Sequence, residues 1–253
     1  MTDLNQLQIL QSNLHKNKER THAILSDPDT QDFAVIMLQE QYWSTYTSSS
    51  PHHHAWTLIE PTTYDTLPRT AIYINNRKIA PIKIAPVPIP INDITAIEVS
   101  LSNLKPPSLL INIYNAPESQ VILEFQRYAT QNIRPEKYEF ILIGGDFNLH
   151  HPLWNPAYYY RHDDNADILI DTMSNLNLNL LLPPGTITYP NAGTAIDLVW
   201  GNAKVEHALI RCTIADEDFG SDHLPIKTEI ATNSVPQISR PYHITSTKLT
   251  GKH

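Results

Sequence analysis

Cysteine, glycine and positive charge are all scarce in this chain. Its 253 residues include one cysteine and 7 glycines, and 18 basic side chains face 26 acidic ones, for a net charge of −8 with histidine neutral. A single cysteine, Cys212, excludes an internal disulfide and a cysteine-rich zinc site. Because it is flanked by Ile210 and Ile214, we expect it to be buried. The acidic balance excludes a broadly basic coat for nucleic acid. It does not exclude a protein that gathers several acids around a metal ion.

Long apolar runs are missing as well. No run approaches 18 apolar residues, and the N-terminal MTDLNQLQIL lacks the basic and apolar regions of a signal peptide. We therefore expect no membrane partner, and no targeting signal is visible. The hydrophobic share of 41% excludes a disordered chain. The length fits one domain with a full core, predicted at 1–230, followed by a polar tail or linker at 231–253.

Short apolar runs separated by polar breaks predict many strands and few helices. Strands are expected at Gln8–Leu10, Phe33–Leu38, Trp56–Ile59, Ala71–Ile74, Ile94–Leu101, Ser108–Ile113, Glu139–Ile143, Ala195–Trp200, Val205–Ile210 and Pro225–Ile230. Helices are expected at Lys16–Leu25, at Ser119–Asn132 with Ser119 as the N-cap, and at Asp164–Leu176. The proline-rich stretch Pro81–Pro90 predicts an edge or a connection. This excess of strands favours two packed sheets with outer helices over a simple alternating arrangement.

One buried strand ends in a pattern that suits catalysis. Ile141–Ile143 runs into Gly144-Gly145, and Asp146 and Asn148 follow on the same side if the backbone stays extended. An acid and an amide that project together can orient a water molecule and a phosphate oxygen. A plain turn is the open alternative, since glycine, aspartate and asparagine are common in turns.

Other predicted strands also begin or end in polar side chains. Each one alone has an ordinary explanation as a solvated strand end or a loop residue. Asp197 differs, because a carboxylate inside an apolar strand needs a partner, and a histidine is the natural one. Taken together, these strand ends predict a site along one edge of packed sheets. The residues concerned are Asn13, Glu40, Tyr114, Asn115, Asp197, Asp222 and His223.

Several segments, in their order along the chain, resemble motifs of the endonuclease/exonuclease/phosphatase superfamily. Within it the chain is most similar to the apurinic-endonuclease-like endonuclease domain of non-LTR retrotransposons. The segments are Gln11-Ser12-Asn13, Leu38-Gln39-Glu40, Ile113-Tyr114-Asn115-Ala116-Pro117, Gly144-Gly145-Asp146-Phe147-Asn148 with the following His150-His151-Pro152-Leu153-Trp154, Thr194-Ala195-Ile196-Asp197-Leu198 and Gly220-Ser221-Asp222-His223-Leu224-Pro225.

The resemblance implies a fold and a set of catalytic residues. The fold would be a four-layer α/β sandwich, with two packed, mostly antiparallel sheets flanked by helices. Asp146 would position or deprotonate the attacking water, and Asn13 and Asn148 would orient Asp146 and the phosphate. His223 would contact the scissile phosphate, and Asp197 would hold its ring.

The resemblance also implies a metal and phosphate contacts. Glu40 would bind Mg²⁺, or alternatively Mn²⁺, with Asp222 near it, as suits hard oxygen ligands. Tyr114 would contact the phosphate or assist the leaving oxygen. Further phosphate or DNA contacts are expected from Asn115, Thr188 and Ser221. Repair enzymes of the superfamily often carry an acid at the position that His15 occupies here.

The implied function is a Mg²⁺-dependent endonuclease that nicks DNA and leaves a 3′-hydroxyl able to prime reverse transcription. DNA would be the main partner, a downstream reverse transcriptase domain and element RNA would be further ones, and the location would be nuclear. Two alternatives stay open: a phosphoesterase acting on a small molecule or lipid, and a decayed domain that only binds nucleic acid.

The sequence also offers candidate DNA-contacting loops and two runs of histidine. Target preference is expected from the loops Trp43–Ala55, Asn155–Asp163 and Asp216–Gly220, because the catalytic residues carry no sequence information. Tyr158-Tyr159-Tyr160-Arg161 fits base contact and burial equally well. We expect His52-His53-His54 to lie in a solvated loop, and His150-His151 to have a structural role in preference to metal binding.

Overall fold

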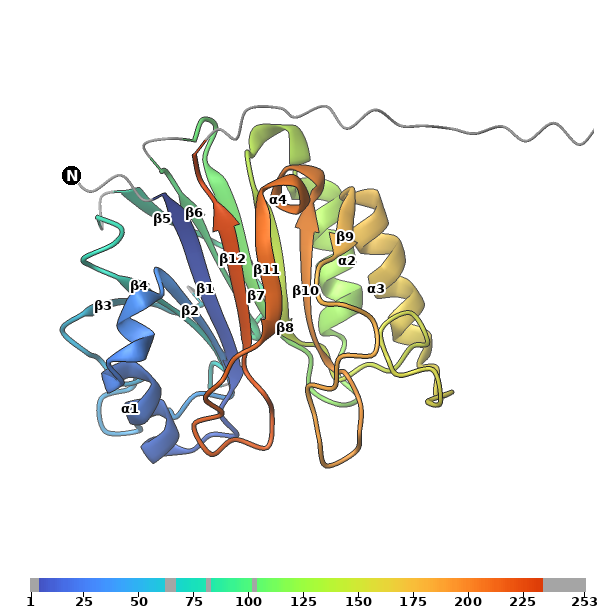
Figure 1. Ribbon diagram of the computed structural model, residues 1–253, viewed down its shortest axis with the longest axis horizontal. Helices are drawn as coiled ribbons and strands as arrows, with labels where there is room; N and C mark the ends of the chain where they lie inside the picture. Colours follow the sequence, from blue (N-terminus) through green and yellow to red (C-terminus); the bar gives the residue numbers. More distant parts are fainter. Residues whose placement is uncertain (1–4, 62–66, 81–82, 102–103, 234–253) are drawn as a thin grey trace, which may run out of the picture.

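The computed structural model describes residues 5–61, 67–80, 83–101 and 104–233 (Figure 1). Most of the predicted tail at 231–253 therefore lies outside the described residues. The strands are β1 (Gln6–Asn13), β2 (Val35–Gln39), β3 (Trp56–Ile59), β4 (Thr70–Asn75), β5 (Ile84–Val87), β6 (Ile94–Val99), β7 (Ser108–Tyr114), β8 (Ile141–Asp146), β9 (Leu178–Leu180), β10 (Asp197–Asn202), β11 (Leu209–Ile214) and β12 (Ile226–Ala231). The α-helices are α1 (Lys18–Ser26), α2 (Val121–Asn132), α3 (Asp164–Asn175) and α4 (Ala203–Ala208). None of the described helices is long and apolar enough to cross a bilayer.

The strands form two six-stranded sheets, which confirms the predicted sandwich. The first sheet has the order β11-β12-β1-β2-β4-β3, and the second has the order β5-β6-β7-β8-β10-β9. Each contains one parallel pair, β1 with β2 and β7 with β8, and the other pairs are antiparallel. In Figure 1, α1 lies at the left of the sheets, and α2 and α3 lie at the right. The layers are thus helix, sheet, sheet, helices.

Three clusters of buried side chains fill the spaces between these layers. Successive residues of a strand point to opposite faces, so each central strand supplies two clusters. In β1, Ile9 lies in the cluster between the sheets, whereas Leu10 packs in the cluster with α1. In β8, Leu142 lies between the sheets, and Ile141 and Ile143 pack in the cluster with α2 and α3. Burial on both faces explains why β8 begins with the continuously apolar run Ile141–Ile143.

The predicted strand at Val205–Ile210 is wrong. Residues Ala203–Ala208 form α4, and β11 begins only at Leu209. The Oδ1 atom of Asn202 accepts a 3.0 Å hydrogen bond from the Val205 amide and caps this helix. A short apolar run cannot distinguish a short helix from a strand.

Three smaller expectations concern the N-cap of α2, the proline-rich stretch and Cys212. The helix α2 begins at Val121 after Gln120, and the Ser119 hydroxyl donates to Asn115 Oδ1, so the predicted N-cap at Ser119 is wrong. The proline-rich stretch was placed correctly, because β5 is an edge strand of the second sheet. Cys212 is buried, as its apolar neighbours predicted.

Polar side chains join the two sheets inside the sandwich. The Gln11 side chain of β1 donates to the Gly145 carbonyl of β8 at 3.0 Å. From the second sheet, Asn112 of β7 donates to the Leu38 and Ala71 carbonyls at 2.8 and 3.0 Å, and it accepts a hydrogen bond from Gln39. Buried polar groups with partners are directional, unlike apolar contacts. These bonds therefore fix one sheet against the other.

Gly145 is required by close packing of β8 against β7. A Cβ atom on Gly145 would lie 1.8 Å from the Ile113 carbonyl oxygen, which belongs to the backbone and cannot rotate away. Gly145→Ala is therefore expected to reduce the free energy of unfolding by about 3 kcal/mol or more. Gly185→Ala is the control: it has a positive φ but no atom nearer than 3.8 Å, so backbone strain of about 1–2 kcal/mol is expected. Urea unfolding would measure both, and equal effects would contradict the packing argument.

Candidate active site

The polar strand ends predicted from sequence meet at one edge of the two sheets. The parallel strands β1 and β2, and likewise β7 and β8, end at this edge. The antiparallel strands β10 and β12 begin there. It is the lower edge in Figure 1. The edge therefore collects residues from positions 13 to 223, and both sheets contribute to it.

Asp146 lies at the centre of this edge, and two asparagines hold its carboxylate. Its Oδ2 atom accepts hydrogen bonds from the side chains of Asn13 at 2.8 Å and Asn148 at 3.1 Å. Its Oδ1 atom accepts one from the Asn148 amide at 3.0 Å. Asn148 has a φ of 48°, which turns the chain back towards Asp146. The structure thus brings these three predicted residues together, with Asn13 from one sheet and Asp146 from the other.

Asp197 and His223 form a buried pair beside Asp146. The Nδ1 atom of His223 lies 2.9 Å from Asp197 Oδ2. The Tyr189 ring lies against the imidazole, with centroids 4.8 Å apart. The sequence predicted that a buried Asp197 would need a histidine, and the structure supplies it. Ligand atoms of Asp146, Asp197 and His223 all lie within 4.8 Å of one another.

Mutual charge shifts the pKa values of this group. Burial raises the pKa of Asp146 above its ordinary value, and the nearby charge of Asp197 raises it further. Burial alone would lower the pKa of His223, but the charge and hydrogen bond of Asp197 outweigh that effect and raise it to about 9. The pair therefore favours a protonated imidazole facing the site.

Tyr114 and Glu40 lie on the other side of Asp146. Burial raises the pKa of Tyr114 above its ordinary value, and the negative charges of Glu40 and Asp146 add to the effect. Glu40 has a φ of 47°, and its Oε1 atom lies 3.1 Å from the Lys16 ammonium. The Arg69 guanidinium lies over the Tyr114 ring, 4.8 Å from its centroid. Sequence reasoning missed both cations, because no apolar pattern or motif marks them.

The carboxylates of Glu40 and Asp222 suit a hard divalent cation by their chemistry, whereas the ligand atoms that converge at this edge among the described residues belong to Asp146, Asp197 and His223. Glu40 is 8% exposed, and Asp222 Oδ1 is buried with no hydrogen-bond partner among the described residues. Carboxylate oxygens of this kind suit Mg²⁺ or Mn²⁺. Repair enzymes often carry an acid at the position of His15. Here the Nδ1 atom of His15 lies 3.8 Å from Asp222 Oδ2.

Three predicted phosphate contacts are engaged within the protein. The buried Thr188 hydroxyl accepts hydrogen bonds from the amides of Ile196 and Asp197 at 3.1 and 3.0 Å. Asn115 donates to the Phe147 carbonyl at 2.7 Å. Ser221 donates to the Asn13 carbonyl at 2.6 Å. These three side chains therefore bond to the backbone of the segments that carry Asn13, Asp146 and Asp197.

The two histidines of the loop after Asn148 pack against aromatic side chains of the same loop. His150 lies against Tyr159, and His151 lies against Trp154, with ring centroids 5.0 and 5.2 Å apart. The Nδ1 atom of His151 accepts a hydrogen bond from the Leu153 amide, so the ring proton sits on Nε2 and faces Asp167 at 3.7 Å. Such packing agrees with the structural role expected for this pair, although ligand atoms of His151, His162 and Asp167 also lie within 4.8 Å of one another.

A family model described as "Endonuclease-reverse transcriptase" matches residues 108–227, which include Asp146, Asp197 and His223. This match supports the resemblance to the endonuclease/exonuclease/phosphatase superfamily over that part of the chain. No curated protein matches this chain in sequence.

Solved structures match the fold of this chain along most of its length. The endonuclease domain of TRAS1, a telomere-specific non-LTR retrotransposon, superposes with a TM-score of 0.70 at 17% identity, covering 90% of this chain and 99% of that one. An AP endonuclease from Leishmania major gives 0.68 at 12% identity, covering 90% and 88%. A 3′-5′ exonuclease from Neisseria meningitidis gives 0.64 at 13% identity, covering 89% and 100%. All three are nucleases by name.

Proposed function

We propose that this domain is a divalent-metal-dependent endonuclease that nicks DNA and leaves a 3′-hydroxyl. The observation that carries the proposal is the meeting of Asp146, held by two asparagines, with the Asp197–His223 pair, within 4.8 Å. A carboxylate opposite an imidazole can place a water molecule and a phosphate between them. The similarity to retrotransposon and AP endonucleases supports a DNA phosphodiester as the substrate.

Each side chain has a role that follows from its contacts. Asn13 and Asn148 donate to Asp146 and leave its carboxylate oriented to accept a proton from water. The raised pKa of Asp146 makes it a stronger proton acceptor than an ordinary aspartate. Asp197 fixes the ring of His223, which leaves Nε2 to contact a phosphate oxygen. The charges of Glu40 and Asp146 both act on the Tyr114 hydroxyl, which would donate to the phosphate or the leaving oxygen.

Glu40 and Asp222 would hold the metal. Bound there, Mg²⁺ or Mn²⁺ would stabilise the negative charge that develops on the phosphate and the leaving oxygen. Lys16 would then exchange its contact with Glu40 for one with the substrate, because the carboxylate cannot serve both cations fully. The similarity to a retrotransposon endonuclease also suggests that a downstream reverse transcriptase domain and element RNA would be partners. The location would then be the nucleus.

Nick mapping on a supercoiled plasmid tests this function. With Mg²⁺ we expect relaxation to open circles whose nicks are extended directly by a DNA polymerase, which requires a 3′-hydroxyl. With EDTA in place of Mg²⁺ we expect no relaxation, and added Mg²⁺ should restore it. Turnover of small phosphate esters with intact plasmid would replace the proposal by a phosphoesterase. Binding of DNA with no cleavage in either metal would replace it by a decayed domain.

A further inference from the structure

An ion pair joins the two sheets at the catalytic edge. Arg69 directly precedes β4 of the first sheet, and Asp93 directly precedes β6 of the second. The guanidinium donates from Nε and Nη2 to the two carboxylate oxygens of Asp93, and the Nε bond measures 2.9 Å. Beside the pair, the hydroxyls of Thr70 and Thr95 lie 2.8 Å apart. Asp93 is buried, so Arg69 supplies the opposite charge that a buried carboxylate needs.

The backbone of the same two residues holds two residues of the candidate site. The Arg69 carbonyl accepts a 2.8 Å hydrogen bond from the Glu40 amide, and the Asp93 carbonyl accepts a 2.9 Å hydrogen bond from the Tyr114 amide. The first bond continues the pairing of β2 with β4, and the second continues the pairing of β6 with β7. The ion pair therefore links Glu40, in the first sheet, to Tyr114, in the second.

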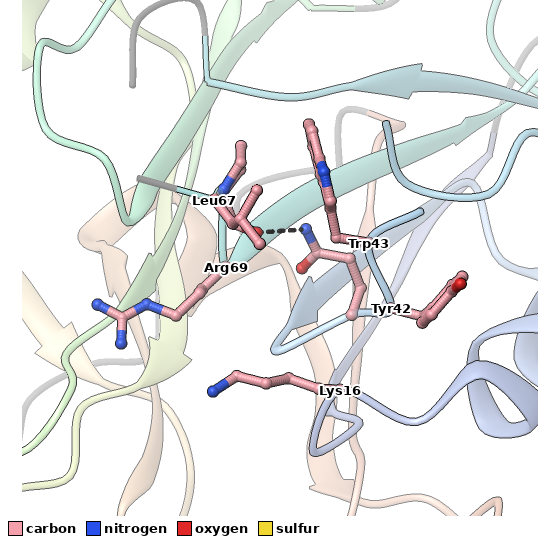
Figure 2. Close-up of a pocket in the computed structure, with 7 residues that line it drawn as sticks. Lys16, Tyr42, Trp43, Leu67 and Arg69 are labelled. Carbon is pink, nitrogen blue, oxygen red and sulfur yellow. Dashed lines mark hydrogen bonds between the residues drawn. The ribbon is translucent and has the colours of Figure 1, made fainter. Parts of the chain in front are cut away.

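The guanidinium of this pair also covers the Tyr114 ring. Its central carbon lies 4.8 Å from the ring centroid, and a cation in this place is attracted to the aromatic face. Figure 2 shows the Arg69 side chain extending towards the same side as Lys16, whose ammonium lies 3.1 Å from Glu40 Oε1. Two parallel hydrogen bonds to one carboxylate fix the plane of a guanidinium. The Tyr114 ring therefore packs against a cation that is itself held in place.

We infer that Arg69 and Asp93 form a positioning pair that sets the Tyr114 phenol relative to Glu40, and that Arg69 acts through Tyr114. A phenol that donates to a phosphate or to a leaving oxygen must be aimed before the substrate arrives, because a misplacement of about 1 Å can cost about 10²-fold in rate. A lysine in place of Arg69 would keep the charge but not the planar fork. The inference rests on the proposed function for the reaction in which Tyr114 takes part.

The double variant Arg69→Met/Asp93→Asn tests this role without leaving a buried charge unpaired. It removes both charges and keeps side chains of similar size, and replacement of a whole buried ion pair is often tolerated by a fold. Thermal unfolding checks that the variant is folded. The kcat for plasmid nicking is expected to fall about 10²-fold, whereas the KM for the plasmid should stay unchanged. A folded double variant with the kcat of the wild type would overturn the inference.

A second ion pair of the same geometry provides the matched control. Arg211 donates from Nε and Nη2 to the two carboxylate oxygens of Glu229 at 2.6 and 3.1 Å, and Glu229 is buried. Glu229 lies opposite Gln8 of β1, well before the strand end at Asn13. Arg211→Met/Glu229→Gln should therefore leave kcat and KM unchanged. An equal loss of kcat in both double variants would show a general effect of ion-pair removal and overturn the inference.

Two further measurements identify the group through which Arg69 acts. Tyr114→Phe added to the double variant should make it no slower than Tyr114→Phe alone, because the pair and the phenol act as one unit. The slope of log DNA affinity against log salt should stay unchanged, whereas loss of a direct phosphate contact by Arg69 would reduce it by about 0.9. Losses of kcat that multiply, or a reduced slope, would overturn the inference.

A crystal structure of the Arg69→Met/Asp93→Asn variant separates this inference from the proposed function. The Tyr114 ring is expected to turn from its observed orientation in this variant and to keep that orientation in the Arg211→Met/Glu229→Gln control. An unmoved ring, in a protein whose wild type nicks DNA, would reject the positioning pair alone. A turned ring, in a protein whose wild type does not nick DNA, would retain the positioning pair and reject the proposed endonuclease.

Discussion

Asp146→Asn is expected to reduce the rate of plasmid nicking about 10³-fold. Asparagine has nearly the same shape as aspartate, but it cannot accept a proton from water, and its amide would face the donors Asn13 and Asn148. Because burial and Asp197 disfavour the charge of Asp146, removal of that charge relieves part of the desolvation cost, so the fold should survive.

Single-turnover nicking with saturating Mg²⁺ measures the effect, and thermal unfolding checks the fold. The matched control is Asp171→Asn, which removes the same charge from the exposed face of α3 and should leave the rate unchanged. Retention of more than a tenth of the activity by a folded Asp146→Asn variant would contradict the role of Asp146.

His223→Ala and Asp197→Asn are expected to behave as one unit. Loss of His223 should lower the nicking rate between about 10²- and 10⁴-fold, since no other described side chain takes the place of the imidazole beside Asp146. Asp197→Asn should lower it less, because the ring stays in place but its charged form loses its partner. The double variant should be no slower than His223→Ala alone, because Asp197 acts through His223.

The two single variants and the double one form a cycle measured by the same nicking assay. His207→Ala, on the exposed face of α4, is the control for loss of an imidazole and should have no effect. Effects of the single variants that multiply in the double variant would show that Asp197 acts on the substrate independently.

Much of the site was predictable from sequence, because a polar residue that directly follows an apolar run must lie at the end of the strand which that run forms. Once the apolar runs were assigned to strands, Asn13, Tyr114 and Asp146 had to lie at strand ends. The parallel pairing of β7 with β8 and the antiparallel pairing of β8 with β10 bring Tyr114, Asp146 and Asp197 to one edge. The polar strand ends together already predicted one site at an edge of the sheets, and the resemblance to a known superfamily supplied the role of each residue. The strand pattern alone gave no pairing order.

Contacts between distant segments could not be predicted in this way. Gln11 and Gln39 read as ordinary polar residues of strands, yet each bonds across the space between the sheets to a partner far along the chain. Thr188 was expected to face the phosphate, but it lies buried under the start of β10. The helix α4 was missed because a six-residue helix buries too little to leave a periodic pattern.

The pairing of β1 with β12 has a consequence for the time at which activity arises. β12 lies between β11 and β1, and its register runs from Gln6 opposite Ala231 to Gln11 opposite Ile226. Asp222 and His223 come into place only when this strand joins the sheet. A nascent chain on the ribosome therefore carries Asn13, Glu40 and Asp146 long before it can complete the site. The domain would therefore have no nicking activity while it is being translated. Activity would begin only after β12 has emerged from the ribosome.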